Sequence, residues 1–391
     1  MKILHTSDWH LGRMIYGRSL LKDQEFFLFE RLIPLLEEER PDCMLIAGDI
    51  FDRQIAPLEA IGLMERFLHE AVQKRGCPVL MVPGNHDSAQ RLALASDLLR
   101  SSGLFIEREL KRNPRPVRLN DSYGPVNFYL LPYFDLAQAR EVYGGEEELQ
   151  TLQDAYEKTV QEIEAGWNPE ERNLLIGHFF AAGSVLSQSE SPLFVGGSGQ
   201  VAPALFQHFD YTALGHIHSA QRVGEKGWYS GSPLKYSFDE EGHKKGVLIV
   251  ELETKGTLSV EHRPVVPLRD MRTISGRFEE LLKKGKEKIA AGKNEDYILV
   301  TLTDETPIYE PVARLREVYP NLLGLTTEWM KSQGDDQDRE TLKEGLSSHK
   351  IDDGTIFQEF LRQVCGEEPS EEDMNIFKEA GRRAAEGGEA G

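Results

Sequence analysis

Five short segments in the first 220 residues each end an apolar run with side chains that bind metal ions. The segments are KILHTSDWH, CMLIAGD, PVLMVPGNHD, NLLIGH and YTALGHIH. The metal-binding residue types that close them are Asp8, His10, Asp49, Asn85, His178, His216 and His218. Mixed nitrogen and oxygen ligands without thiolates suit manganese, iron or zinc better than calcium. The pattern therefore predicts a hydrolase with two divalent metal ions, and manganese is our first choice.

The spacing within these segments favours chelation. Residues two apart along a strand face the same side, so Asp8 and His10 can converge on one ion, and His216 and His218 can do the same from another strand. Asp49 opens the sequence DIFD, and its carboxylate has two oxygens that can hold two ions about 3.5–4 Å apart. Such a pair of ions binds a phosphate group.

In the sequence GNHD, the neighbouring residues Asn85 and His86 are expected to have different roles. If Asn85 ligates a metal ion through its carbonyl oxygen, His86 points toward the substrate. A positioned imidazolium that protonates a poor alkoxide leaving group contributes about 10²- to 10⁴-fold in rate. We therefore expect His86 to be the catalytic acid and Asp87 to orient its imidazole from behind.

A simpler explanation exists for each motif alone. A histidine at a strand end is more often a hydrogen-bonded surface residue than a metal ligand, and His178 can be satisfied by backbone groups. The occurrence of all five motifs at strand ends favours the metal site.

Strand-like and helix-like runs alternate up to about Pro267, which is typical of a parallel sheet. In such sheets, functional residues gather at the carboxyl ends of the strands. Later strands, such as VNFYLLPY, WYSGSP, GVLIVELE and LSVEHRPV, are separated by short turns, which suggests antiparallel additions and a second sheet. The predicted fold class is α/β, a two-sheet sandwich flanked by helices.

Changes in composition and hydrophobic periodicity along the chain predict four parts. Residues 1–266 form the domain that carries the motifs, and residues 267–331 form a small α/β domain. Residues 332–349 are a polar, acidic linker, and residues 350–391 contain two short amphipathic helices. Their apolar faces either dock a partner or pack on their own domain, and the linker favours docking. The docking candidates are Phe357, Phe360, Leu361, Ile376 and Phe377.

The composition excludes several classes of protein. A net charge of −20 argues against coating nucleic acid by bulk electrostatics, so any DNA contact is local or assisted by a partner. The three cysteines lie far apart and form no CxxC, which favours a reducing cytoplasm over a disulfide framework. No apolar run approaches the ~18 residues that would span a bilayer. The sequence contains no GxxxxGK[ST], so any ATP dependence belongs to a partner.

Candidate phosphate contacts lie close to the motifs. Four arginines follow them shortly, and they are expected to contact DNA phosphates without reading bases: Arg13, Arg18, Arg53 and Arg91. The most basic segment, KRNPRPVR at residues 111–118, is equally well explained as a solvated hairpin.

The ordered set D-x-H, G-D, G-N-H and G-H-x-H resembles the calcineurin-like metallophosphoesterase superfamily. The blocks ILHTSDWHLGR, AGDIFDRQIAP, VPGNHDS and GSPLKYSFDE resemble, more narrowly, the SbcD family of nuclease subunits from bacterial double-strand-break processing complexes. Residues 267–331 are similar to the capping domain of that family, and the last helix pair to its partner-binding segment. The resemblance thus covers essentially the whole chain.

The resemblance implies a role for each motif residue. One ion would be held by Asp8, His10, Asp49 and His218. The second would be held by Asp49, Asn85, His178 and His216. His86 matches the catalytic histidine, and Asp52 sits where related nucleases can carry a substrate-positioning histidine, so it is a near-site candidate only.

The resemblance also implies a function, namely exonuclease and endonuclease activity on double-stranded DNA ends and hairpins in DNA repair, recombination and replication. The partner would be an SbcC-like coiled-coil ATPase, with the chain as a homodimer within a heterotetramer. Family members pair through the helices after the second and third strands, although apolar residues there equally suit core packing. A small-molecule or nucleotide phosphodiesterase and a catalytically silent docking subunit are the alternatives. The complete ligand set disfavours the silent subunit, and the terminal docking arm disfavours the small-molecule enzyme.

Overall fold

The computed structural model describes residues 1–145, 149–190, 199–290, 292, 295–306 and 308–328, together with residues 370, 374 and 377. Internal contacts divide the chain into two compact units, residues 1–272 and 273–391. Among the described residues, no helix is both long and apolar enough to cross a membrane.

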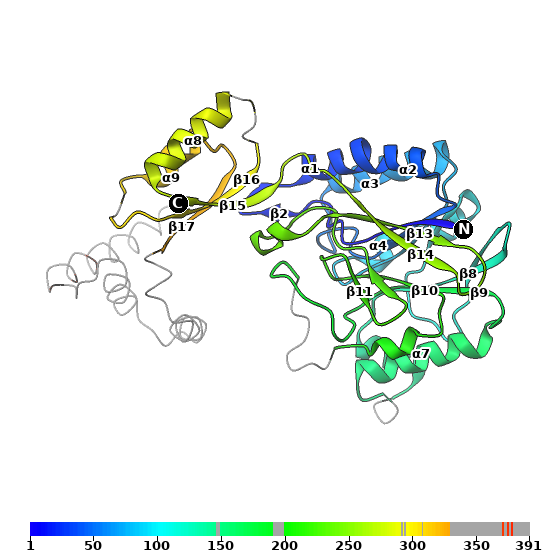
Figure 1. The fold of residues 1–391 in the computed structure, drawn as a ribbon. Coiled ribbons are helices and arrows are strands. Elements are labelled where there is room, and N and C mark those ends of the chain that lie inside the picture. The colour runs from blue at the N-terminus through cyan, green and yellow to red at the C-terminus, as the bar shows by residue number, and fades with distance from the viewer. Residues whose placement is uncertain are drawn as a thin grey trace, which may run out of the picture. The chain divides into compact units, whose positions relative to one another are not determined.

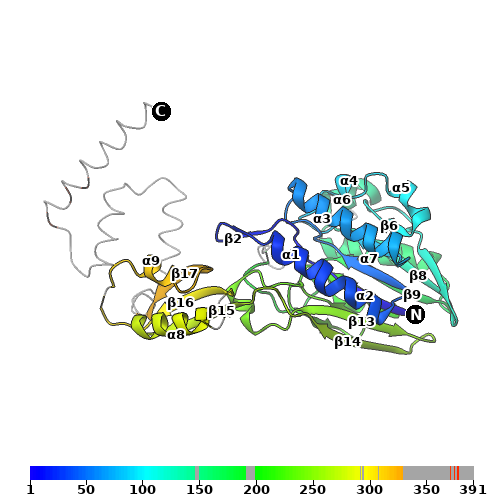
Figure 2. The ribbon, with the colours of Figure 1, turned by 90° about the horizontal axis from the view of Figure 1, so that it is seen from above.

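The first unit contains two six-stranded sheets (Figures 1 and 2). The first sheet has the order β14-β13-β1-β4-β5-β6. Its four parallel strands are β1 (Lys2–Thr6), β4 (Cys43–Ala47), β5 (Val79–Val82) and β6 (Leu104–Ile106). An antiparallel pair extends its other edge, β13 (Gly246–Leu252) and β14 (Leu258–Pro264).

The second sheet has the order β11-β12-β10-β9-β8-β7. Its four parallel strands are β8 (Gly124–Leu131), β9 (Arg172–His178), β10 (Tyr211–Gly215) and β12 (Gly227–Tyr229). Antiparallel strands close the two edges, β7 (Val117–Asp121) and β11 (Gln221–Val223). The expected antiparallel pairing is thus found for β13 and β14, whereas β8 and β12 each have an antiparallel partner on one side and a parallel partner on the other. Two helices lie between β8 and β9, and such a crossover connection returns the chain parallel.

Apolar side chains from both sheets meet in one core between them, including Leu45 and Leu80 from the first sheet and Phe128 and Ile176 from the second. Helices flank the sandwich, with α1 to α3 on one side and α7 on the other (Figure 1). The predicted two-sheet α/β sandwich is therefore confirmed. The helices and helical turns of the first half are α1 (Leu21–Phe27), η1 (Leu28–Leu32), α2 (Ile33–Glu39), α3 (Leu58–Leu68), η2 (His69–Lys74), α4 (Ala89–Leu92), α5 (Ser96–Leu99) and η3 (Arg100–Ser102).

The helices of the second half begin at identifiable signals. Helix α6 (Leu136–Tyr143) and helix α7 (Leu152–Gly166) each start with a capping box, in which an Asp135 or Thr151 side chain accepts the N–H of the third helical residue. Helix α7 buries Tyr156 and Ile163 against the outer face of the second sheet. Short 3₁₀ turns complete this half, η5 (Pro203–Phe206) and η6 (Phe238–Gly242), and a small hairpin follows β1, made of β2 (Met14–Ile15) and β3 (Arg18–Ser19).

The second unit has a three-stranded sheet of order β15-β16-β17. Its elements are β15 (Met271–Gly276), α8 (Phe278–Ala290), β16 (Tyr297–Leu302), α9 (Pro311–Arg316) and β17 (Leu322–Thr327). This order is the strand, helix, strand, helix, strand that the sequence pattern predicts. The compact unit defined by internal contacts begins at residue 273, and the predicted domain bounds stay a prediction. The predicted linker 332–349 lies outside the described residues, as do the terminal helices apart from residues 370, 374 and 377.

Candidate metal centre

Five strands of the first unit deliver their carboxyl ends to the same place. The backbone after β1 pairs with the backbone after β4, because Asp8 N–H donates to Gly48 O (3.0 Å) and His10 N–H donates to Asp49 O (2.9 Å). Asp8, His10 and Asp49 all adopt positive φ angles, of 55°, 44° and 51°. Such conformations cost non-glycine residues about 1–3 kcal/mol each and gather at functional sites. The two loops are therefore held in shape before any ligand binds.

The first group of ligand atoms centres on two imidazoles. His10 Nε2 lies 3.2 Å from His218 Nε2 and 3.6 Å from Asp49 Oδ2. Asp8, His10 and His218 together offer ligand atoms that all lie within 4.8 Å of one another. This is the group to which the family resemblance assigns one ion.

The second group centres on Asn85. Its Oδ1 lies 3.0 Å from His178 Nε2 and 3.2 Å from His216 Nδ1. His178 Nε2 also lies 3.4 Å from Asp49 Oδ2. The structure thus brings all seven predicted ligands together in two adjoining groups.

Asp49 belongs to both groups through one oxygen. Its Oδ2 faces His10 and His178, whereas its Oδ1 accepts the main-chain N–H of His86 at 2.9 Å. Oδ2 is thus the oxygen that faces ring nitrogens of both groups. That the Asp49 carboxylate holds two ions stays a prediction.

The donors fit divalent cations. Ligands bound to one ion at about 2.0–2.2 Å lie roughly 3 Å apart when their bonds are at right angles, close to the separations seen here. All of the ligands except Asn85 are buried. Among the described residues, none forms a hydrogen bond with the buried Nδ1 of His10. Since so many buried lone pairs without a cation would be costly, the site fits two metal ions.

The ionisation of these groups also fits. Burial lowers the pKa of His216 to about 3, so its imidazole is neutral, as a ligand must be. Burial raises the pKa of Asp8 to about 8, and the Asp49 carboxylate adds to this rise. Burial disfavours a charged His178, yet the Asp49 carboxylate outweighs this and raises the pKa of His178 to about 9. Cation binding would therefore displace protons from this cluster.

Two glycines of the motifs are required by close approach. A Cβ on Gly84 would collide with the Asp49 carboxylate, and a Cβ on Gly48 would collide with the His178 imidazole. Gly48 also has a φ of +87°, which side-chain-bearing residues rarely adopt. The glycines of G-D and G-N-H thus make room for the metal ligands beside them.

His86 is half-buried next to the first group, with its ring edge-on to that of His10 at 4.8 Å between centroids. Its Nδ1 lies 2.9 Å from the main-chain oxygen of Asp52. Because a carbonyl oxygen only accepts, Nδ1 carries a hydrogen, and a proton for transfer would reside on Nε2.

Asp87 does not orient that imidazole, so the expectation was wrong. Its two oxygens accept main-chain N–H groups from Ile50 (3.1 Å), Phe51 (2.8 Å) and Gly84 (2.9 Å). Burial raises the pKa of Asp87 to about 6, and the nearby Asp49 carboxylate adds to this shift. Asp87 therefore ties the loop after β4 to the loop after β5, and the Asp52 carbonyl takes the predicted orienting role.

Asp52 and Arg13 lie beside the site as a pair. Arg13 Nη1 donates to Asp52 Oδ1 at 3.1 Å, and the guanidinium lies over the Tyr236 ring at 4.9 Å. Asp52 Oδ1 is also 3.7 Å from His10 Nδ1. Arg18 is half-buried in β3, whereas Arg53 and Arg91 are exposed. Arg13 is thus held beside the ligand cluster through Asp52.

The sequence motifs did not reveal the polar residues that lie behind the ligands. Ser7 Oγ donates to Asp8 at 2.5 Å, and Tyr236 Oη donates to Trp9 O at 2.6 Å. Glu240 and Lys245 are buried next to His218. The block GSPLKYSFDE contains two of these residues, yet nothing in its residue types separates a buried charge from a solvated one.

A profile of the calcineurin-like phosphoesterases matches residues 1–220, and a profile described as the type 5 capsule protein repressor C-terminal domain matches residues 267–364. The SbcD subunit of the nuclease SbcCD from Staphylococcus saprophyticus subsp. saprophyticus is 32% identical over 369 residues, which cover 94% of each chain. The chain belongs to the SbcD family of calcineurin-like phosphoesterases. The family member of Staphylococcus epidermidis, also named as the SbcD subunit of the nuclease SbcCD, is 31% identical over 379 residues and covers 97% of each chain.

Both family resemblances predicted from the motifs are confirmed. As a member of the SbcD family, the chain is a metal-dependent enzyme that hydrolyses phosphate esters. A dimetal phosphatase from Danio rerio is a structural neighbour, with a TM-score of 0.44 and 14% identity, and the match covers 68% of this chain and 97% of that one.

Proposed function

We propose that the chain is the nuclease subunit of a DNA-processing complex and hydrolyses phosphodiester bonds at double-stranded ends and hairpins with two Mn²⁺ ions. The observation that carries the proposal is the pair of ligand groups joined by Asp49 Oδ2, with His86 beside them. The similarity over nearly the whole chain to proteins named as SbcCD nuclease subunits supports DNA as the substrate.

The chain's residues divide the work between binding and proton transfer. Asp8, His10, Asp49 and His218 would hold one ion, and Asn85, His178 and His216 would hold the second with Asp49. When bound, the two ions supply Lewis acidity that favours attack of water on phosphorus.

His86 would act on the leaving group. With its Nδ1–H donated to the Asp52 carbonyl, the ring keeps one orientation and presents the proton on Nε2 to the departing sugar oxygen. Protonation of this oxygen avoids a poor alkoxide leaving group and is worth about 10²- to 10⁴-fold.

The test compares hairpin and blunt-ended DNA with a chromogenic phosphodiester, using the purified chain and Mn²⁺. We expect Asp49→Asn to abolish hydrolysis. His86→Leu should bind Mn²⁺ normally and cleave DNA about 10²- to 10⁴-fold more slowly. The exposed His208, which pairs with Glu164, offers the control His208→Leu with unchanged rates. DNA cleavage by His86→Leu at the normal rate would refute the acid assignment, and cleavage of the small substrate alone would refute DNA as the substrate.

We also propose an SbcC-like coiled-coil ATPase as the partner, bound through the terminal helices. The acidic linker and the lack of a P-loop motif in the sequence support this assignment. Phe377 is half-buried in the described part, and the other docking candidates lie outside it.

We also propose that four arginines contact DNA phosphates, namely Arg13, Arg18, Arg53 and Arg91. We further propose that the chain works in the cytoplasm, where its buried free thiols Cys43 and Cys77 stay reduced.

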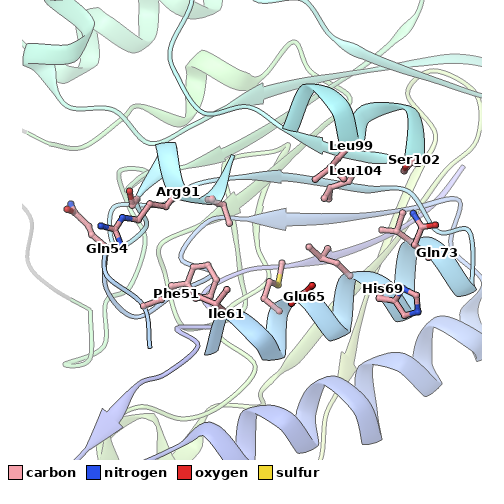
Figure 3. Close-up of a pocket in the computed structure, with 16 residues that line it drawn as sticks. Phe51, Gln54, Ile61, Glu65, His69, Gln73, Arg91, Leu99, Ser102 and Leu104 are labelled. Atoms are coloured by element: carbon pink, nitrogen blue, oxygen red, sulfur yellow. The ribbon is translucent and has the colours of Figure 1, made fainter. Parts of the chain in front are cut away.

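A homodimer within the heterotetramer is supported by exposed apolar residues on α3, on α5 and on the turn between α4 and α5. Leu58, Leu94 and Leu98 are 82%, 77% and 79% exposed. Beside them, a pocket of about 460 Å³ opens between α3 and the segment from α4 to β6 (Figure 3). Its lining includes Ile61 and Leu99. Exposed apolar patches of this kind mark protein interfaces, and a self-complementary patch favours a two-fold dimer.

A further inference from the structure

A buried ion pair lies directly behind His218. Glu240 belongs to the turn η6, and Lys245 immediately precedes β13. Lys245 Nζ lies 2.5 Å from Glu240 Oε2, and both side chains are almost fully shielded from solvent. Charged residues are seldom fully buried, so the position of this pair calls for an explanation.

The pair and its neighbours hold His218 at three points. Lys245 Nζ donates to the main-chain oxygen of His218 at 2.8 Å. The carboxylate of Glu190 accepts the main-chain N–H of His218. On the ring, Nδ1 lies 2.6 Å from Ser189 Oγ and 3.5 Å from Glu240 Oε1.

These contacts determine which ring nitrogen carries hydrogen. Ser189 Oγ donates its hydrogen to the Glu240 carboxylate, so it can only accept from His218 Nδ1–H. The lone pair of His218 is therefore on Nε2, the atom that faces His10 Nε2 at 3.2 Å. Partners of this kind fix the orientation of a metal-binding histidine and increase its basicity.

We propose that Glu240, neutralised by Lys245 and acting directly and through Ser189, is the positioning residue that makes His218 a metal ligand. The inference rests on the proposed ligand role of His218. His178 makes a different contact, because its Nδ1 is held by the main-chain oxygen of Ala47 at 2.9 Å. The Glu240 carboxylate makes the His218 imidazole more basic than a carbonyl partner would. An ion held by His10 and His218 would therefore have the more basic ligand.

The test is equilibrium Mn²⁺ binding to the full chain, measured by calorimetry and by the electron paramagnetic resonance of free Mn²⁺. We expect Glu240→Gln to weaken one of two Mn²⁺ equivalents by about 10- to 100-fold, while the other is retained. His218→Ala should weaken the same equivalent. The matched control is Asp210→Asn. Asp210 is also a buried carboxylate paired with a lysine, Lys255. It lies immediately before β10, and His216 follows the other end of that strand.

Equal Mn²⁺ affinities for Glu240→Gln and the wild type would overturn the proposal, as would equal weakening by Glu240→Gln and Asp210→Asn. If Glu240→Gln does not fold, the variant Glu240→Gln with Lys245→Met removes both charges of the buried pair and is held to the same criterion. Failure of the wild type to bind two equivalents would refute the two-metal site itself. If the wild type binds two equivalents of Mn²⁺ and His218→Ala loses one, normal Mn²⁺ affinity of Glu240→Gln would refute only the positioning role of Glu240.

Discussion

The close approach of the loop after β5 to Asp49 makes Gly84→Ala a sensitive probe of the centre. A Cβ at Gly84 would lie 2.5 Å from the Asp49 main-chain nitrogen and 2.8 Å from its carboxyl carbon. Ordinary carbon contacts are about 3.5–4.0 Å, so one of the two loops must move by roughly 1 Å. In either case Asp49, whose Oδ2 faces both ligand groups, shifts relative to the loop after β5.

The expected cost has two parts. Overpacking of a buried site costs about 1–3 kcal/mol, which corresponds to a decrease in Tm of roughly 2–12 °C for a domain of this size. A displacement of about 1 Å at a catalytic group costs on the order of 10²-fold in rate. Gly84→Ala should therefore lose far more activity than its stability loss explains.

The assay measures Tm by calorimetry, Mn²⁺ affinity by titration and kcat on a chromogenic phosphodiester. Gly62→Ala is the matched control, because Gly62 lies inside α3 with open space around its Cβ position. Alanine there should stabilise the helix by about 0.5–1 kcal/mol and leave kcat unchanged. Normal Mn²⁺ affinity and normal kcat in Gly84→Ala would refute the claim that Asp49 holds the centre together.

Three further perturbations test other parts of the account. Asp87→Ala leaves two buried N–H groups and one partly buried N–H group without their acceptor, so we expect a loss of at least about 2 kcal/mol in chemical denaturation. An unchanged midpoint would contradict the loop-tying role. Leu98→Glu should give a folded monomer in light scattering, because the side chain is 79% exposed and lies outside the core of the chain, whereas a persistent dimer would exclude this surface. Deletion of residues 349–391 should retain Mn²⁺-dependent phosphodiesterase activity and abolish co-elution with the ATPase. An intact complex on gel filtration would refute docking through the terminal helices.

The candidate metal centre could be predicted from the sequence because its proposed ligands follow a simple rule. Each ligand closes a buried apolar run, and the carboxyl ends of parallel strands meet at one edge of a sheet. Asp8, Asp49 and His178 are far apart in the chain, yet strand identity alone is enough to place them together. The capping boxes of α6 and α7 are equally local signals.

The parts that could not be predicted depend on loop paths and strand direction. The acceptor role of Asp87 requires knowing that the N–H groups of Ile50 and Phe51 turn toward the loop after β5. The direction of β8 and β12 follows from connections, whereas residue types indicate only that they are strands. Glu240 and Lys245 look like surface residues in the sequence, since charged side chains are rarely buried.

The most direct test of the two-metal centre is anomalous diffraction at the manganese edge from crystals grown with Mn²⁺. The account predicts two peaks about 3.5–4 Å apart, with Asp49 Oδ2 bound to both ions. One peak should lie at His10 and His218, and the other at Asn85, His178 and His216. A single peak, or two peaks that do not share Asp49, would contradict it.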